Sequence, residues 1–289
     1  MKTIGPDWWG LAWASLPMAV GLALLSWQRL GQVRPMLIAT ARLVGQMMLL
    51  AVSFGAIVAA DSAILVVAVA ALMLGVAAHT VASRMSSGRR VRVGVEAFAA
   101  MALGSVVVLA VSSQLALKVQ PWYDARVILP LLGMILGNCV TAVALAAERL
   151  DADLEADRDL VERCLSLGAS PRQAATPALR AAVAAGLTPI INNMMIAGIV
   201  AIPGMTTGQI LAGADVGSAV RYQILMYLGI AGTTTIGVQV LLWSRLRRAF
   251  THAEQLRRPE ERERPRPRPE GRGRGRDGSA EPIGDDQGA

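Results

Sequence analysis

The sequence predicts an all-α fold: a polytopic integral membrane protein with about seven transmembrane helices. Hydrophobic residues make up 54% of the 289 residues and charged residues only 17%, whereas a soluble globular chain carries roughly a quarter charged residues. Several apolar stretches exceed the roughly 18 residues that mark a membrane-spanning helix. Unpaired backbone amides are costly in hydrocarbon, so helices are the only plausible spanning form for these stretches.

Seven apolar segments are each close to the length that a tilted spanning helix needs. They cover approximately residues 10–27, 36–59, 63–82, 95–116, 127–147, 182–202 and 219–243. We therefore assign a transmembrane domain to residues 1–248. The composition changes from about residue 249 onward, and in residues 262–276 Pro, Arg, Gly and Glu alternate with almost nothing apolar to bury. This composition predicts a disordered cytoplasmic tail over residues 249–289 that is either simply solvated or bound to anionic lipid.

The arginines predict the orientation of the spans. They gather in the loops after the first, third and fifth spans and after the last span, while the loops between are nearly neutral. The arginines concerned are Arg29, Arg34, Arg84, Arg89, Arg90, Arg92, Arg149, Arg158, Arg163, Arg172, Arg180, Arg245, Arg247 and Arg248. Cytoplasmic loops carry the excess of basic residues, so we expect the N-terminus outside and the C-terminus in the cytoplasm. The chain is then multi-pass in the cell inner or plasma membrane.

The composition also argues against several classes of function. The net charge of +7 does not indicate nucleic acid binding, because the basic residues flank apolar spans or lie in the tail without interleaved aromatic side chains. Lys2 and Lys118 are the only lysines and neither lies in a P-loop motif, so this chain carries no ATPase site of that kind. Cys139 lies in an apolar run and Cys164 in a polar one, which disfavours a disulfide framework or a cysteine zinc site.

The cytoplasmic loop at about residues 148–181 is the most informative part of the sequence. Leu150, Leu154 and Val161 belong to a helical stripe beneath a charged face, so the fifth spanning helix is expected to continue into the cytoplasm. A break follows at residues 166–171, where a glycine permits a tight turn and Ser-Pro suits the start of a new helix. We expect a helix, a turn and a short helix before the sixth span.

This construction resembles the coupling loop of ABC-transporter permeases, whose signature is E-A-A-x-x-x-G followed by apolar residues. Glu162 and Gly168 have the matching spacing, although Arg163 and Cys164 replace the two alanines. A short helix held rigidly between two spans can transmit motion from a partner protein; the alternative is an ordinary hairpin, which rarely needs a loop this long. The residues expected to couple to an ATPase are Glu162, Leu167, Gly168, Ala169, Ser170 and Pro171.

Four stretches in the second half carry a more specific resemblance: residues 133–138 (GMILGN), 165–171 (LSLGASP), 202–213 (IPGMTTGQILAG) and 221–224 (RYQI). They resemble the small iron-export-type ABC permeases, whose plant relatives are linked to aluminium tolerance and to nucleotide-sugar transport. In hydropathy the resemblance covers roughly residues 35–245. This chain has Met205-Thr206 where the family often has two consecutive methionines, which weakens the case for a methionine metal site.

The resemblance implies the membrane-spanning permease subunit of an ABC exporter. Two copies of this chain would work in the lipid bilayer with a separate ATPase subunit. ATP and Mg²⁺ would be bound by that subunit, so this chain would hold no cofactor and would not itself be an enzyme. Iron, or another transition-metal ion, is the substrate that the family implies, and a nucleotide sugar or another small solute is the alternative within the class.

Polar residues in the apolar segments are candidates for the translocation pathway, because hydrocarbon exposure is unfavourable for them. Arg42 could equally snorkel to the cytoplasmic surface, and amides in a bundle usually hydrogen-bond between helices. Glu96 could pair with Arg92, one helical turn before it. Methionine packs in cores and suits copper(I) better than iron, so no metal ligands are assigned. The pathway candidates are Arg42, Gln46, Asn138, Asn192, Asn193, Met205 and Gln209.

A seven-span sensor or an ATP-independent transporter is the rival hypothesis. A proton-coupled carrier normally needs buried carboxylates, but Asp61, Asp124 and Asp215 all fall in predicted loops. Their positions favour an external energy source, and co-purification with an ATPase would discriminate between the two classes. A membrane-embedded enzyme is the least favoured class, since the sequence shows neither a nucleophile–base pair nor a metal motif.

Overall fold

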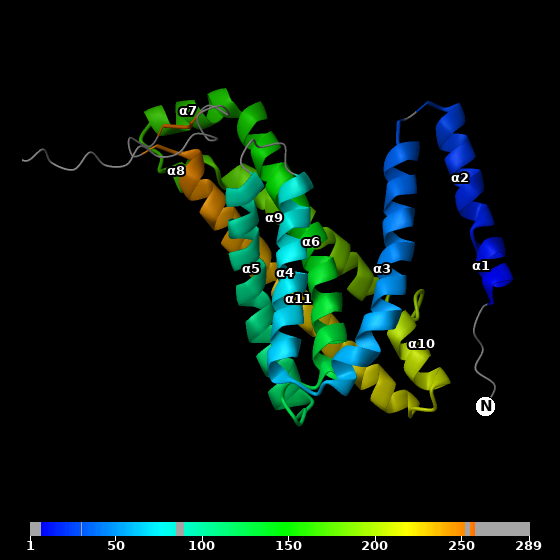
Figure 1. The fold of residues 1–289 in the computed structure, drawn as a ribbon. Coiled ribbons are helices and arrows are strands. Elements are labelled where there is room, and N and C mark those ends of the chain that lie inside the picture. Colours follow the sequence, from blue (N-terminus) through cyan, green and yellow to red (C-terminus); the bar gives the residue numbers. More distant parts are fainter. Residues whose placement is uncertain (1–6, 30, 85–89, 252–254, 258–289) are drawn as a thin grey trace, which may run out of the picture. The chain divides into compact units, whose positions relative to one another are not determined.

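The computed structural model describes residues 7–29, 31–84, 90–251 and 255–257, and its regular elements there are helices (Figure 1). Among these described residues, two isolated β-bridges join Ala197 to Ala201 and Phe250 to Leu256. The helices are α1 (Trp8–Ala14), α2 (Leu16–Trp27), α3 (Val33–Ala59), α4 (Ala63–Arg84), α5 (Arg90–Ala110), the π-helical turn η1 (Val111–Ala116), α6 (Ala125–Ala156), α7 (Arg158–Ser166), α8 (Pro171–Ala174), α9 (Thr176–Ile196), α10 (Gly204–Leu211) and α11 (Val216–Ala249). The all-α prediction is confirmed.

Seven stretches among the described residues are long and apolar enough to cross a membrane, which confirms the predicted spans. They are Trp9–Trp27, Val33–Ala59, Ala63–Arg84, Val93–Ala116, Ala125–Ala156, Thr176–Ile196 and Val216–Ala249. The sixth ends before the expected residue 202, because Ala197 is extended and Gly198 has a φ of +83°. That left-handed conformation favours glycine and does not continue a helix. The orientation of the spans remains a prediction.

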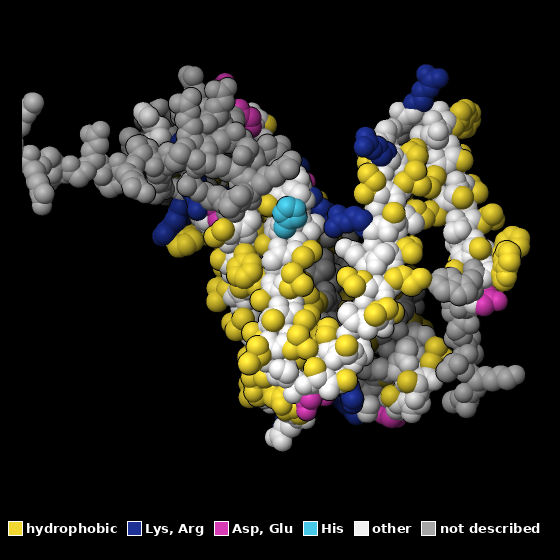
Figure 2. Space-filling model, viewed as in Figure 1, with side chains coloured by type: hydrophobic (Ala, Val, Ile, Leu, Met, Phe, Trp, Pro, Cys, Tyr) yellow, Lys and Arg dark blue, Asp and Glu magenta, His cyan; other side chains and the backbone are white. Residues whose placement is uncertain are grey.

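The contacts divide the chain into two compact units, and the first comprises Met1–Met73 and Leu109–Met134. Its core contains Val66, Ala125 and Leu129, against which residues of α3 such as Phe54 and Ile57 pack. The helices α2 and α3 contain no buried residue. Figure 2 shows hydrophobic side chains along the visible helices. Such exposure is unfavourable in water and expected in lipid, which solvates apolar side chains and leaves backbone groups to bond within each helix.

The second unit comprises Leu74–Val108 and Ile135–Ala289, and its helices approach one another closely at two glycines. A Cβ atom at Gly186 of α9 would lie 2.9 Å from the carbonyl oxygen of Ala142 in α6. A Cβ atom at Gly237 of α11 would lie 2.9 Å from Cys139 Sγ, also in α6. Because these distances are shorter than ordinary van der Waals contacts, each position has room only for glycine. Helices α9 and α11 are thereby fixed against α6.

Two arginines near the end of α11 form ion pairs with other helices of the second unit. Arg245 pairs with Asp151 of α6, and Arg248 pairs with Glu96 of α5. The side chain of Glu96 is only 8% exposed. These pairs bind the end of α11 to two neighbouring helices.

Described structure continues beyond residue 248, where the predicted tail begins. Phe250 and Leu256 are 5% and 4% exposed, and they form an antiparallel bridge to each other. The chain therefore turns back after α11 and buries two apolar side chains. Residues 258–289 of the predicted tail lie outside the described residues.

Candidate functional site

The segment between α6 and α9 has the construction expected of a coupling loop. Helix α6 continues past its membrane portion to Ala156, and Leu150 and Leu154 are 0% and 1% exposed. Val161 of α7 is 3% exposed. The apolar stripe predicted from the sequence therefore faces the protein interior, and it holds α7 against the second unit.

A tight turn at Gly168 ends α7. Gly168 has a φ of +88°, a left-handed conformation that glycine adopts without strain. The Gly168 amide donates to the Leu165 carbonyl at 3.0 Å, and the Ala169 amide donates to the Cys164 carbonyl at 3.0 Å. These bonds satisfy carbonyls that the end of a helix otherwise leaves unpaired. The turn predicted at this glycine is confirmed.

The short helix α8 begins with a capping box. The Ser170 hydroxyl accepts a hydrogen bond from the Gln173 amide, and the Ser170 amide donates to Gln173 Oε1 at 2.9 Å. Pro171 occupies the first helical position, where a missing N–H costs nothing. The predicted cap and helix start are therefore confirmed, and α8 is held in one conformation although it is only four residues long.

The turn between α7 and α8 presents an apolar side chain to the exterior. Leu167 is 88% exposed, and the neighbouring Glu162 and Ser170 are exposed as well, while Ala169 and Pro171 are half-buried. Leu167 lies between the glycine turn that ends α7 and the capped start of α8. The predicted coupling residues thus form one continuous segment, Glu162–Pro171, called the coupling segment below.

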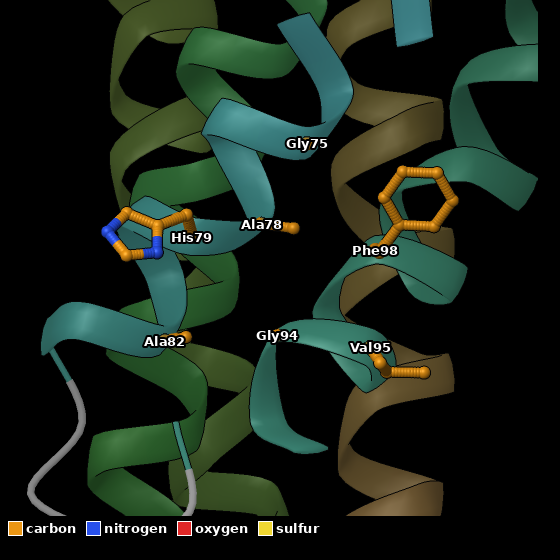
Figure 3. A pocket seen from close by; sticks show the side chains of 7 residues that line it. All are labelled: Gly75, Ala78, His79, Ala82, Gly94, Val95 and Phe98. Atoms are coloured by element: carbon orange, nitrogen blue, oxygen red, sulfur yellow. The ribbon is translucent and has the colours of Figure 1, made fainter. Parts of the chain in front are cut away.

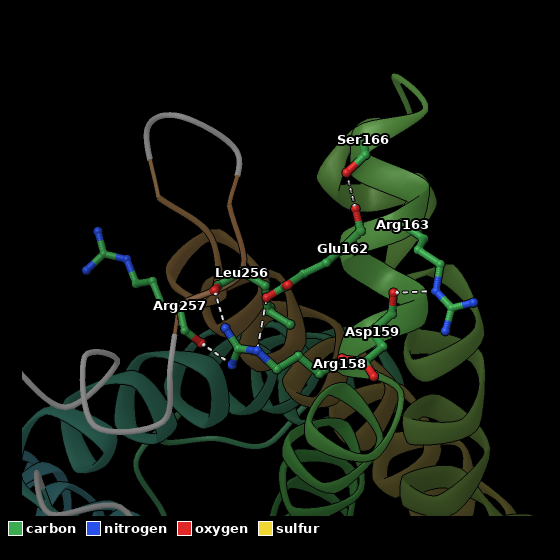
Figure 4. Close-up of polar contacts among 7 residues, drawn as sticks. All are labelled: Arg158, Asp159, Glu162, Arg163, Ser166, Leu256 and Arg257. Carbon is green, nitrogen blue, oxygen red and sulfur yellow. Dashed lines mark hydrogen bonds and ion pairs between the residues drawn. The ribbon is translucent and has the colours of Figure 1, made fainter.

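One arginine next to the coupling segment is not among the residues expected to couple to an ATPase. Arg158, the first residue of α7, forms an ion pair with Glu162 at 2.9 Å. Its guanidinium also donates to the carbonyl oxygens of Leu256 and Arg257, beyond the end of α11 (Figure 4). The pairing with Glu162 follows from their spacing of one helical turn, but the contacts to the C-terminal residues have no local signal.

The pathway candidates occupy several helices. Arg42 and Gln46 are exposed and lie one turn apart on α3 in the first unit. In the second unit, Asn138 is half-buried on α6 and has a polar partner, while Asn192 and Asn193 are exposed near the end of α9. Met205 and Gln209 are half-buried and lie one turn apart on α10. Their role in transport remains a prediction.

Helix α10 is tied to α11 by a polar contact that the sequence did not reveal. Thr206 is 5% exposed, and its hydroxyl donates to Gln223 Oε1 at 3.2 Å. Both residues belong to the motif stretches described above, but their proximity depends on how α10 folds back onto α11. Gly213, which has a φ of +92°, lies in the turn between these two helices. The stretch from residue 203 to residue 217 is therefore a short helix and a turn, and not a further span.

A cavity of about 390 Å³ lies between α4 and α5 in the second unit (Figure 3). Its lining is apolar apart from His79, and the residues concerned are Gly75, Ala78, His79, Ala82, Gly94, Val95 and Phe98. One imidazole does not provide the ligand set of a metal site. Within the described residues, no three His, Cys, Asp or Glu side chains are grouped so that they could hold a metal ion.

Comparison with known proteins agrees with this architecture. Residues 8–250 match the profile of the uncharacterised protein family UPF0014. The membrane protein slr1647 of Synechocystis, described as a UPF0014 protein, is 33% identical over 86% of this chain and 96% of its own length. The UPF0014 membrane protein STAR2 of rice is 32% identical over 84% of both chains.

A third relative has a name that indicates transport. The probable iron export permease protein FetB of Escherichia coli is 30% identical over 56% of this chain and 61% of its own length. No solved structure matches the chain. The family match covers most of the chain and all seven apolar helices. The chain is therefore a multi-pass membrane protein and belongs to the UPF0014 family.

Proposed function

We propose that this chain is the membrane-spanning permease subunit of an ABC exporter, driven by a separate ATPase subunit that binds ATP and Mg²⁺. The observation that carries the proposal is the coupling segment. It has a fixed turn, a capped short helix and an exposed leucine, and it leads directly into the sixth span. An ordinary connection between two spans rarely needs a polar loop as long as this one.

The contacts beyond the coupling segment support a route for motion into the membrane. Helix α8 is followed at once by α9, and Ala175 between them is fully buried. A Cβ atom at Gly186 of α9 would lie 3.2 Å from the side chain of Val238 in α11. Packed interiors transmit displacement because they have few voids. A shift of α8, produced when two ATPase subunits close on ATP, would therefore be passed to α9 and α11.

Two copies of the chain with two ATPase subunits form the proposed transporter. Helices α2 and α3, which bury no residue within one copy, leave apolar surface for lipid or for the second copy. The candidate pathway consists of the polar residues identified above. Iron is the proposed cargo because the relative from Escherichia coli is named an iron export permease.

Transport into inside-out membrane vesicles tests this function. The tagged chain is purified from its native membranes, the ATPase that accompanies it is identified by mass spectrometry, and both are expressed together. We expect ATP-dependent accumulation of radioactive Fe²⁺ in inverted vesicles. A partner ATPase with its catalytic glutamate replaced is the control. Accumulation of a nucleotide sugar in place of iron would overturn the proposal that iron is the cargo. The absence of any ATPase partner would overturn the proposed function.

A further inference from the structure

The described residues after α11 form a short reversal of the chain, which we call the strap: Phe250, Thr251, Gln255, Leu256 and Arg257. The Thr251 amide donates to the Gln255 carbonyl at 2.9 Å. The Arg257 amide donates to the carbonyl of Ala249, the last residue of α11, at 2.8 Å. These two bonds and the buried side chains of Phe250 and Leu256 join the described residues of the strap to the end of α11.

Arg158 joins the strap to the coupling region. Its Nη2 donates to the Leu256 carbonyl at 2.8 Å and its Nη1 donates to the Arg257 carbonyl at 3.4 Å. Its Nε forms the ion pair with Glu162 of the coupling segment. One guanidinium therefore holds acceptors from two parts of the chain that are far apart in sequence (Figure 4).

The surroundings of Arg158 strengthen these contacts. Its side chain is 23% exposed, and Leu256, whose carbonyl it binds, is buried. Hydrogen bonds from a charged donor are roughly twice as strong as neutral ones, and a carbonyl buried without a partner costs free energy. Loss of the guanidinium would therefore remove both of these hydrogen bonds between α7 and the strap.

We infer that Arg158 is a positioning residue for coupling: it fixes the strap to α7, so that α11 follows the movement of the coupling segment. This inference rests on the proposed function, because it takes Glu162–Pro171 as the surface that the ATPase moves. It adds a second connection from that surface to α11, separate from the route through α8 and α9. Residues 158 and 256–257 are then part of the machinery that couples ATP hydrolysis to transport.

The chemistry of the side chain explains why arginine is needed at this position. Guanidinium presents five donors in a planar fork, so it can hold a carboxylate and two carbonyls at once. Lysine offers a compact charge on a flexible stem and cannot reproduce that fixed arrangement. Arg158→Lys should therefore keep the ion pair with Glu162 but hold the strap poorly, while Arg158→Gln should lose both.

Arg149 provides a matched control within the same region. Its Nε forms an ion pair with Asp153, also one helical turn further on and also at 2.9 Å. Its side chain is 55% exposed, and its partner Asp153 lies on α6 itself and not in the strap. Arg149→Gln therefore removes an equivalent local ion pair without touching the strap.

The experiment uses the full-length chain in lipid nanodiscs, with and without the ATPase that co-purifies with the wild type. Hydrogen–deuterium exchange reports on the amides of Thr251 and Arg257, and ATP hydrolysis with and without the permease reports on coupling. For Arg158→Gln we expect exchange at these amides to rise roughly tenfold. We also expect loss of the permease-dependent stimulation of ATP hydrolysis, with the yield of the complex unchanged. Arg149→Gln should match the wild type in all three measurements.

Unchanged exchange in Arg158→Gln would overturn the inference, and so would faster exchange with normal stimulation of ATP hydrolysis. If Arg158→Gln does not yield folded protein, Leu256→Ala carries the test, because it loosens the strap while leaving the ion pair of Arg158 with Glu162 intact. If the wild-type chain co-purifies with no ATPase, that result appears before any variant is made, and it counts against the proposed function and not against the role of Arg158.

Discussion

Arg248, near the end of α11, forms an ion pair with Glu96 of α5, a carboxylate whose side chain is only 8% exposed. A charge that is taken out of water needs a partner, since its hydration is lost on burial. Arg248 comes from the far end of the transmembrane domain, and the pair joins α5 to α11. The side chain of Arg92, which the spacing in the sequence also offers as a partner of Glu96, lies outside the described residues.

Removal of this arginine should weaken the second unit. Arg248→Leu leaves Glu96 buried without its ionic partner, and we expect a loss of about 1–3 kcal/mol in the free energy of unfolding. The measurement is thermal or denaturant unfolding in a mild detergent. Arg247→Leu is the control, because Arg247 stacks on the exposed ring of Trp243 and should cost only about 0.5–1 kcal/mol. Equal effects of the two changes would contradict the importance of the buried pair.

The effect of a substitution at Gly168 should depend on how readily the new residue adopts a positive φ, and not on the space around it. A Cβ atom there would meet nothing within 4 Å, but the φ of +88° strains any side chain. We expect Gly168→Val to distort the turn, at a cost of about 1–3 kcal/mol, and to abolish ATPase docking while the helices still insert. Gly168→Ala should be milder, and Gly168→Asn milder still, because asparagine adopts this region more readily. Complex yield and ATPase rate in nanodiscs measure the effect. Full activity of the valine variant would mean that the loop is a simple connector.

Gly237 should tolerate no added carbon unless its neighbour is made smaller. Gly237→Ala places a methyl group 2.9 Å from Cys139 Sγ, and overpacking of this kind costs about 1–3 kcal/mol. The double change Gly237→Ala with Cys139→Ala removes the sulfur and should restore part of the stability. Gly137→Ala is the matched control on α6, since nothing lies within 4 Å of its position. Unfolding temperatures in detergent compare the variants, and a Gly237→Ala protein as stable as Gly137→Ala would argue against this close approach.

Asp215 is the N-cap residue of α11, and its carboxylate accepts a hydrogen bond from the Ser218 amide. We expect this hydrogen bond to persist to low pH. Hydrogen bonds from the backbone and then the side chain of Ser218 lower the pKa of this carboxyl below 3.8, and Arg221 nearby lowers it further. The pKa of Asp215 is lower in the folded chain than in the unfolded chain. The cap therefore contributes fully to folding stability at pH values above the unfolded pKa, and this contribution is lost as the pH falls through the folded pKa. Nuclear magnetic resonance of the Ser218 amide should show a transition with a midpoint below pH 3.8. Asp215→Asn should abolish it, and a midpoint above that value would contradict the cap.

Cys164 provides a probe of orientation. It is half-buried on α7, whereas Cys139 is fully buried in α6. In a Cys139→Ala protein, a membrane-impermeant maleimide should label Cys164 in inside-out vesicles and not in intact cells. Labelling from outside intact cells would reverse the predicted topology and place the coupling segment on the wrong side of the membrane for an ATPase.

Features that depend on neighbouring residues could be predicted from the sequence. The seven spans follow from the length of each apolar run, and the start of α8 follows from Ser170 and Pro171, because capping involves residues within one turn. The exposure of Leu167 also agrees with its place between two polar helices. The extent of the buried structure beyond residue 248, where the predicted tail begins, was harder to predict. Phe250 and Leu256 are two apolar residues at the edge of a polar segment, and nothing local indicates that they are buried.

The sequence by itself determined that this chain crosses a membrane as seven helices and that one long polar loop carries a turn and a capped helix. Hydropathy, glycine and capping residues act over a few residues, so their effects can be read along the chain. Only the tertiary structure decided that Arg158 holds Leu256 and Arg257, that Arg248 neutralises Glu96, and that Gly237 accommodates Cys139. Each of these contacts joins residues far apart in sequence. Their formation depends on how whole helices pack, and packing is set by the shape and charge of every helix in the second unit together.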